Sequence, residues 1–166
     1  MVSLASWWAS KVRQFRSHVT ARVGQDERAG LADWLTPEQL ALFDSMHLAD
    51  RRHGLDVVAT LRRDGAIDHD LLVAGLLHDA GKGRTGVGPR VAFALGQAYG
   101  PWVWRVSRVV PAWRAPLDRL AVHADSSATL AETAGCSPRT VELIRHQDAP
   151  VDPEAGRALQ LADEAN

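Results

Sequence analysis

The chain has 166 residues, of which 46% are hydrophobic and 23% are charged, proportions that are ordinary for one soluble globular domain. Its 19 basic and 20 acidic residues leave a net charge of -1, so no overall positive field draws in nucleic acid or an anionic membrane. The single cysteine, Cys136, excludes an intrachain disulfide and a cysteine-rich zinc site, and a reducing, cytoplasmic location is expected. No apolar run approaches the roughly 20 residues that span a bilayer.

The first half of the chain predicts helices in sequence. An amphipathic stretch from about Leu4 to Val23 is expected to form a helix. Thr36-Pro37-Glu38-Gln39 is a helix start, because Thr36 can cap, Pro37 suits the first turn and Gln39 can reach back to the cap. The helical pattern continues to Arg63, and a break is expected between His47 and Arg51 because about thirty uninterrupted residues are long for a globular domain.

The next expected helix is the most informative part of the chain. Asp68 is a plausible cap, and the run Leu71 to Leu77 is apolar on every side, which is typical of a buried helix. This run leads directly into His78-Asp79. The stretch from Gly81 to Pro89 contains four glycines and predicts a loop.

The second half of the chain adds further helical segments and no sustained strand alternation. The expected helices are residues 91–99, residues 101–109, residues 117–133, a helix that starts at Ser137-Pro138 and ends near His146, and residues 153–165. The sequence therefore predicts an all-α, single-domain bundle of about six to eight helices. The tryptophan-rich region 102–113 carries no motif that assigns it a role.

His78 and Asp79 stand at the end of the expected buried helix, where a charged side chain needs a partner. Burying an imidazole and an ionised carboxylate is costly unless something pairs with both. A divalent metal ion satisfies both at once, whereas the alternative is an exposed helix end where the two side chains are solvated. Other candidate ligands in the chain are His53, His123, His146 and Asp163. A single histidine on a helix is more often structural or solvated, so His123 and His146 depend on the wider pattern.

The order of these residues resembles the HD-domain metal-dependent phosphohydrolase superfamily. Arg52-His53-Gly54-Leu55-Asp56-Val57 matches the first histidine motif, and His78-Asp79 matches the doublet that names the family. Ala80-Gly81-Lys82 continues the doublet as members commonly do, and Leu161-Ala162-Asp163 matches the final aspartate motif. The resemblance implies an HD domain over residues 36–166. Residues 1–35 would then form an N-terminal helical segment that packs on this domain.

The same resemblance implies a ligand set. In the two-metal branches of the superfamily, residues at the positions of His53, His78, Asp79 and Asp163 hold one metal. His123 and His146 would hold the second metal, with Asp79 bridging the two. Mixed histidine and carboxylate ligands suit Fe, Mn, Zn, Co or Ni better than Mg, so one or two such divalent ions are the expected cofactor.

The function that the resemblance implies is metal-dependent hydrolysis. A metal-activated water would cleave a phosphoester or phosphoanhydride of a small, nucleotide-like substrate, and no nucleic acid partner is expected. Asp79 and Lys82 would be the catalytic residues, and Lys82 and Arg84 would bind the substrate phosphate. Two alternatives stay open: a non-catalytic HD regulatory module, and a di-iron oxygenase built on the same ligands. The sequence identifies neither the substrate nor the oligomeric state.

Overall fold

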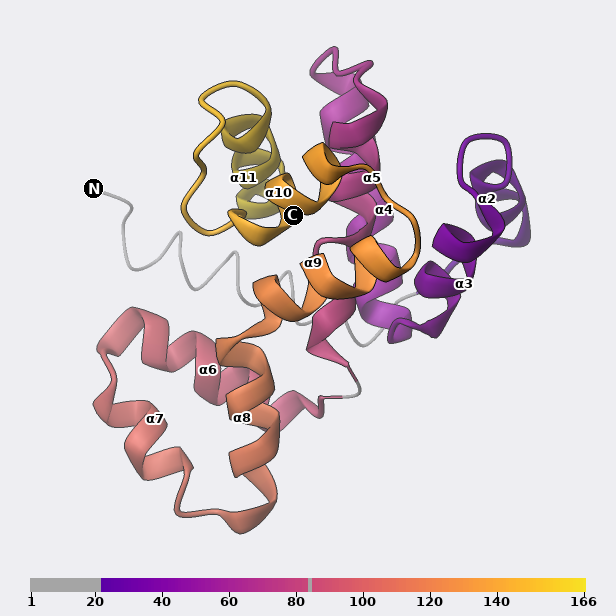
Figure 1. Cartoon of the computed structure of the whole chain (residues 1–166). Coiled ribbons are helices and arrows are strands. Elements are labelled where there is room, and N and C mark those ends of the chain that lie inside the picture. The colour runs from indigo at the N-terminus through magenta and orange to yellow at the C-terminus, as the bar shows by residue number, and fades with distance from the viewer. Residues whose placement is uncertain (1–21, 84) are drawn as a thin grey trace.

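The computed structural model describes residues 22–83 and 85–166. Within these ranges the secondary structure consists of ten α-helices and two 3-10 helices, with no strand (Figure 1). The elements are α2 Gln25–Leu31, α3 Pro37–Ser45, α4 Leu48–Arg63, α5 His69–Leu77, η1 Ala80–Lys82, α6 Val87–Tyr99, α7 Trp102–Ser107, η2 Pro111–Trp113, α8 Arg114–Ala121, α9 His123–Thr133, α10 Pro138–Arg145 and α11 Ala155–Ala165. The all-α prediction is confirmed. The expected N-terminal helix, from about Leu4 to Val23, falls almost wholly on residues 1–21, which lie outside the described residues.

The helix starts that the sequence indicated are present. Thr36 and Gln39 form a reciprocal capping box: the Gln39 amide donates to the Thr36 hydroxyl at 3.3 Å, and the Thr36 amide donates to the Gln39 side chain at 3.1 Å. The break lies at Met46 and His47, whose backbones are extended, which is at the start of the expected range and one residue before it. His47 then caps α4, because its Nδ1 accepts the Ala49 amide at 3.3 Å.

The described residues form more helices than the six to eight predicted. One expected helix is divided in two, and one short helix was not expected. Residues 117–133, expected as one helix, divide into α8 and α9 because the backbone leaves the helical conformation at Val122. The short helix α2 has no strong signal in the sequence. The loop predicted over residues 81–89 is also shorter than expected, since η1 takes its start and α6 begins at Val87. Pro89 fits the first turn of α6, where an amide proton is not needed.

Helix α5 lies at the centre of the hydrophobic core. All residues of the run 71–77 are buried, as the sequence predicted, and α4, α10 and α11 surround them. Gly54 in α4 allows the closest approach, because a Cβ at this position would collide with the carbonyl oxygen of Leu76. The contact brings His53, the neighbour of Gly54, beside the end of α5. The core therefore positions one candidate ligand against another.

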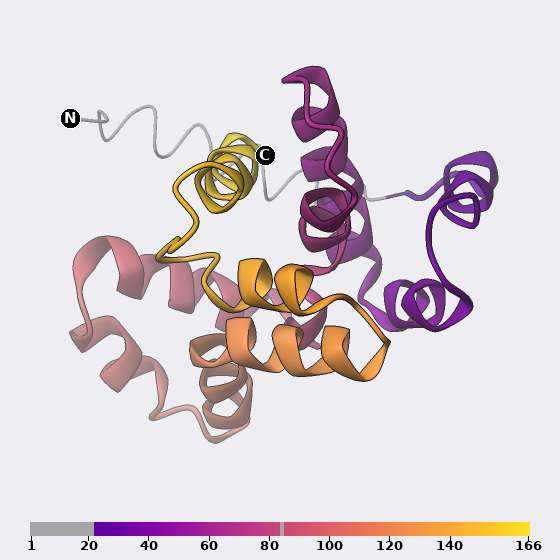
Figure 2. The same ribbon diagram turned by 45° about the horizontal axis from the view of Figure 1, so that its top comes forward.

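Helices α6, α7 and α8 form a lobe that projects to one side of this core (Figures 1 and 2). The lobe joins the core through η1 and through α9, which packs on η1. Within the described part of the chain, no helix is both long enough and apolar enough to cross a membrane.

Candidate metal centre

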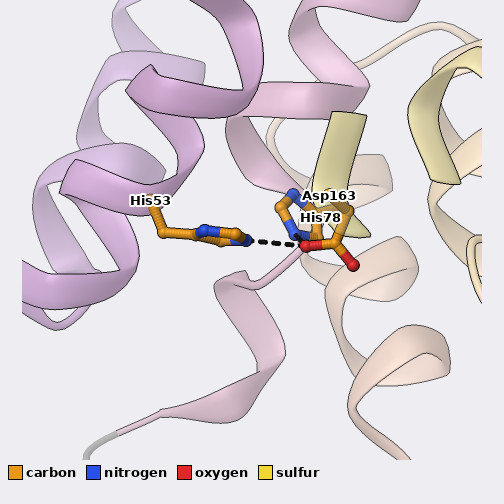
Figure 3. Close-up of side chains that lie close together, drawn as sticks. All are labelled: His53, His78 and Asp163. Atoms are coloured by element: carbon orange, nitrogen blue, oxygen red, sulfur yellow. Dashed lines mark hydrogen bonds and ion pairs between the residues drawn. The ribbon is translucent and has the colours of Figure 1, made fainter. Parts of the chain in front are cut away.

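Three helices bring together residues that are far apart in the sequence. His53 comes from α4, His78 stands at the C-terminal end of α5, and Asp163 comes from α11 (Figure 3). One possible ligand atom from each lies within 4.8 Å of the others. The Nε2 atom of His53 is 2.8 Å from Oδ1 of Asp163, and the Nε2 atom of His78 is 3.4 Å from the same oxygen. We call these three residues the metal cluster; such a group can hold a metal ion.

Asp79 lies at the edge of the metal cluster. Its buried carboxylate places Oδ1 at 3.5 Å from Nε2 of His78 and Oδ2 at 4.0 Å from Nε2 of His53. The ammonium group of Lys82 donates to Oδ2 at 2.6 Å. One oxygen of Asp79 is therefore neutralised by the chain itself, and the other faces the imidazole of His78.

Backbone carbonyls fix the protonation of two histidines in the site. Nδ1 of His78 is 2.9 Å from the Gly75 carbonyl oxygen, and Nδ1 of His123 is 2.8 Å from the Leu120 carbonyl oxygen. A carbonyl only accepts hydrogen bonds, so Nδ1 carries a proton in both rings, and Nε2 is the ring atom left for another partner. Both Nε2 atoms lie near Oδ1 of Asp79, at 3.5 Å from His78 and 4.0 Å from His123. A metal ion that displaces any proton from these nitrogen atoms would be held by both rings and the carboxylate.

Two buried polar atoms in the described structure have no hydrogen-bond partner at this point: Nε2 of His78 and Oδ1 of Asp79. A buried polar atom without a partner costs on the order of 1–3 kcal/mol, and more if it is charged. Imidazole nitrogen and carboxylate oxygen are the donor atoms that divalent transition metals prefer. The chemistry of the two unpartnered atoms therefore fits a shared cation.

Neighbouring charges in the site offset the cost of burying these groups. Burial alone would lower the pKa of His78, but the carboxylates of Asp79 and Asp163 raise it to about 9. Burial would raise the pKa of Asp163, yet the hydrogen bond from His53 and the positive charge of the nearby His78 hold it well below its usual value. Burial likewise opposes ionisation of Asp79, but the charges of His78 and Lys82 lower its pKa. Both carboxylates are thus ionised, and a proton on His78 Nε2 stands where a metal can bind.

Supporting contacts that the sequence did not reveal hold the end of α5 in place. The Gln147 side chain donates to the His78 carbonyl oxygen at 3.1 Å, and the Gly81 amide donates to the Ser127 hydroxyl at 2.8 Å. A Cβ at Gly81 would lie 2.5 Å from the His123 carbonyl oxygen, so α9 packs directly on this turn. No local pattern distinguishes these residues from ordinary polar ones, because their roles depend on how the helices pack.

The sequence also did not predict a buried ion pair that lies beside the site. Arg90 of α6 donates to both oxygens of Asp50 at 2.6 and 2.7 Å, and its Nε donates to the Thr85 carbonyl oxygen at 3.0 Å. The Thr85 hydroxyl in turn donates to the Lys82 carbonyl oxygen at 2.7 Å. Because Asp50 lies one turn before His53, the pair ties the segment after His78-Asp79 to the helix that carries His53.

The remaining predicted site residues are placed differently. His146 lines a small pocket with Arg139, Glu142 and Asp152, and the contacts of the described residues do not join its side chain to the metal cluster. Its role as a ligand stays a prediction, as does that of His123. Arg84 lies outside the described residues.

Comparisons of the chain with protein-family models, with curated proteins and with solved structures find no match. The assignment of the site therefore rests on the geometry of its own side chains, a histidine and carboxylate group that could hold a metal ion.

Proposed function

We propose that this chain is an HD-type, metal-dependent phosphohydrolase that cleaves a phosphoester or phosphoanhydride of a small, nucleotide-like substrate. The observation that carries the proposal is the pair of buried, unpartnered atoms on His78 and Asp79 beside His53 and Asp163. The order of the motifs supports it, because the histidine, the His-Asp doublet and the late aspartate stand in the sequence order of that superfamily.

Each residue of the site has a role in this proposal. His53, His78, Asp79 and Asp163 hold a divalent cation of the Fe, Mn, Zn, Co or Ni type. Such a cation neutralises the negative charge of a phosphate and lowers the pKa of the water that it binds. His123 and the more distant His146 are the proposed ligands of a second cation, shared through Asp79, whose Oδ1 is 4.0 Å from His123 Nε2.

Lys82 has the properties of a phosphate ligand. Burial would lower its pKa, but the carboxylates of Asp79 and Asp163 raise it, so the ammonium group stays charged. The Lys82 side chain is also partly exposed, whereas Asp79 is buried. Lys82 can therefore hold the charge of Asp79 with one hydrogen and reach a substrate oxygen with another.

Hydrolysis by defined metal forms of the full chain tests the proposal. The protein is stripped with a chelator, reloaded separately with Mn, Fe, Zn, Co, Ni or Mg, and assayed against mono-, di- and cyclic nucleotides and dinucleoside polyphosphates. We expect turnover that depends on a transition metal, and Asp79→Ala should abolish it while the helical circular dichroism is kept. Asp64→Asn, a change of an exposed carboxylate far from the site, should leave turnover unchanged.

Two results contradict the proposal. Fully loaded protein that is inert against the whole panel excludes this hydrolase activity. An iron-loaded protein that consumes oxygen and releases no phosphate favours the oxygenase alternative.

A further inference from the structure

In the lobe of α6, α7 and α8, two tryptophans pack against α6 and so determine which side of α7 faces outward. Gly88, Ala92 and Gly96 are spaced four residues apart and share one face of α6. A Cβ at Gly88 would lie 2.7 Å from the Trp113 ring, and a Cβ at Gly96 would collide with the Trp104 ring. These two tryptophans therefore lie against the small residues of α6 and are structural.

Trp104 is held in one orientation. Its ring stacks on Phe93 with a centroid distance of 5.4 Å and an interplanar angle of 18°, and its Nε1 donates to the Phe93 carbonyl oxygen at 3.1 Å. Because Trp104 is fixed against α6, the opposite side of α7 is turned outward.

The outward side of α7 and the turn after it is apolar. Trp102, Val106 and Val109 are spaced by four and three residues, which places them along one side. They are 57%, 61% and 75% exposed. The Trp102 Nε1 group donates to the Tyr99 carbonyl oxygen at 2.9 Å, so the polar atom is satisfied and the exposed part of the ring is apolar. We call Trp102, Val106 and Val109 the Trp102 face.

Exposed arginines follow the Trp102 face along α7, the turn after it and α8. Residues 99–121 contain four arginines and one acidic residue, a local charge of +3 in a chain whose net charge is -1. The four arginines are all exposed: Arg105, Arg108, Arg114 and Arg119. Asp118, the single acidic residue, is paired with Arg108. This surface therefore favours a partner that carries negative charge and accepts apolar side chains.

The shape of the lobe favours one such partner. The lobe projects from the core in both views, and α7 packs on α6 at its outer side (Figures 1 and 2). A projecting apolar surface flanked by basic residues can enter the interfacial layer of a bilayer. Tryptophan beside arginine is the combination that lies at the level of lipid head groups, because the ring is amphipathic and the guanidinium binds phosphate.

We propose that the lobe docks on an anionic lipid bilayer surface. The Trp102 face enters the head-group region, and Arg105 and Arg114 contact lipid phosphates. This proposal is independent of the metal centre, because none of its residues belongs to the metal cluster.

Co-sedimentation of the full chain with lipid vesicles tests the proposal. The protein is mixed with phosphatidylcholine vesicles or with vesicles that also contain phosphatidylglycerol. We expect binding to the anionic vesicles only, weakened by added salt because exposed charges are screened. Arg105→Glu should weaken the binding by roughly fivefold or more, the usual contribution of one basic residue near such a surface. The double change Trp102→Ser and Val106→Ser should weaken it at least as much.

Matched controls separate the lobe from the rest of the chain. Arg157→Glu makes the same charge change at an exposed position of α11, and Ile67→Ser removes an apolar side chain that is 94% exposed near the start of α5. Both should bind as the unchanged protein does. Asp163→Ala should also keep vesicle binding, so a failure of the proposed hydrolase function would leave this result intact.

The lobe variants decide the question, because residues 1–21 also contain tryptophans and basic residues and could bind lipid by themselves. Unchanged vesicle binding by the lobe variants overturns the proposal, as does equal binding to neutral and anionic vesicles. Self-association of the chain that the Trp102→Ser and Val106→Ser changes abolish, without any binding to lipid, would show that a second copy covers this face and also overturns it.

Discussion

At the scale of single residues, the proton and the metal compete for one atom. The Nδ1 proton of His78 is held by the Gly75 carbonyl, so any second proton and any metal must share Nε2. The pKa of this histidine is raised to about 9 by the carboxylates of Asp79 and Asp163, which more than offset burial. Metal binding near neutral pH must therefore displace a proton from His78.

This competition predicts how metal affinity depends on pH. Apparent affinity should rise as pH increases towards about 9, where His78 loses its proton, and level off above that value. The slope should approach tenfold per pH unit, and close to one proton should be released near neutral pH. Titration calorimetry in buffers with different heats of ionisation measures both quantities. Affinity that stays constant between about pH 6.5 and 9 would contradict the protonated state of His78.

The stability of the metal-free protein should have the opposite pH dependence. A folded-state pKa above the unfolded value contributes stability that is complete below about pH 6.5 and is lost as pH rises through about 9. The lowered pKa of Asp163 contributes stability above its unfolded pKa, and this stability is lost in acid as the pH falls. Urea unfolding of chelated protein across this range should show a decline on the alkaline side. Asp163→Ala, which removes one cause of the raised pKa, should reduce that decline.

The residues of the site differ in how far the sequence could predict them. His53, His78 and Asp163 were identified because their spacing follows a recognisable order of motifs, and the structure brings them together. Gln147, Ser127 and the pair of Asp50 with Arg90 carry no such order. Their partners lie 40 or more residues away, so only the packing of the helices reveals them.

At the scale of helices, the spacing of α4 and α5 controls the geometry of the metal cluster. Gly54→Ala should force the two helices apart, because the new Cβ would collide with the rigid backbone oxygen of Leu76. We expect a loss of stability on the order of 1–3 kcal/mol, as for other overpacked sites, together with weaker metal binding through displacement of His53. Urea unfolding and metal titration measure the two effects.

Gly30→Ala in α2 is the matched control. No atom lies within 4 Å of a Cβ at Gly30, so the change should be neutral or stabilise the protein by up to about 1 kcal/mol through helix propensity. Equal effects of the two substitutions would contradict the close-approach argument for Gly54.

The ion pair of Arg90 with Asp50 joins α6 to α4. Arg90→Ala leaves the buried Asp50 carboxylate without its partner, and breaking a buried pair in this way typically costs about 3–5 kcal/mol. The double change Asp50→Ala and Arg90→Ala should cost clearly less than the sum of the two single changes. A double-mutant cycle by urea unfolding measures the difference. Additive costs would show that the pair does not stabilise the fold.

The sequence predicted helix starts better than helix ends and breaks. Thr36 and Asp68 are caps with a local chemical reason, and both accept backbone amides of the helices that they begin. The break at Val122 has no proline, glycine or capping side chain of its own. Both α8 and α9 pack on η1, an arrangement between distant elements that no local pattern contains.

At the scale of the whole molecule, a metal ion would tie the C-terminal helix α11 to α4 and to the end of α5, which lie much earlier in the chain. Binding to the folded state alone stabilises it by about 2.7 kcal/mol when the free metal concentration is 100 times the Kd. For a protein of this size, that corresponds to a rise in Tm of roughly 5–10 °C. Scanning calorimetry of chelated and reloaded protein measures the shift. Asp163→Asn should abolish most of it, and a full shift in that variant would place the ion elsewhere.

The all-α character of the molecule follows from the absence of strand alternation, and α5 was correctly predicted as a buried helix from its apolar residues. Two helices of the lobe were predicted, at residues 91–99 and 101–109, but its outward surface was not, because tryptophan and valine are found both in cores and on binding surfaces. Only the packing of Trp104 and Trp113 against α6 shows that Trp102 faces outward.

Anomalous diffraction from crystals of the metal-loaded full chain tests the central claim most directly. We predict an anomalous peak that marks a metal ion bound by Nε2 of His53, Nε2 of His78 and a carboxylate oxygen of Asp163. Each metal–ligand distance should be roughly 2.0–2.2 Å, as is typical of such ligands. Fully loaded crystals with no peak among these three residues, or with the two imidazoles turned away from each other, would contradict it.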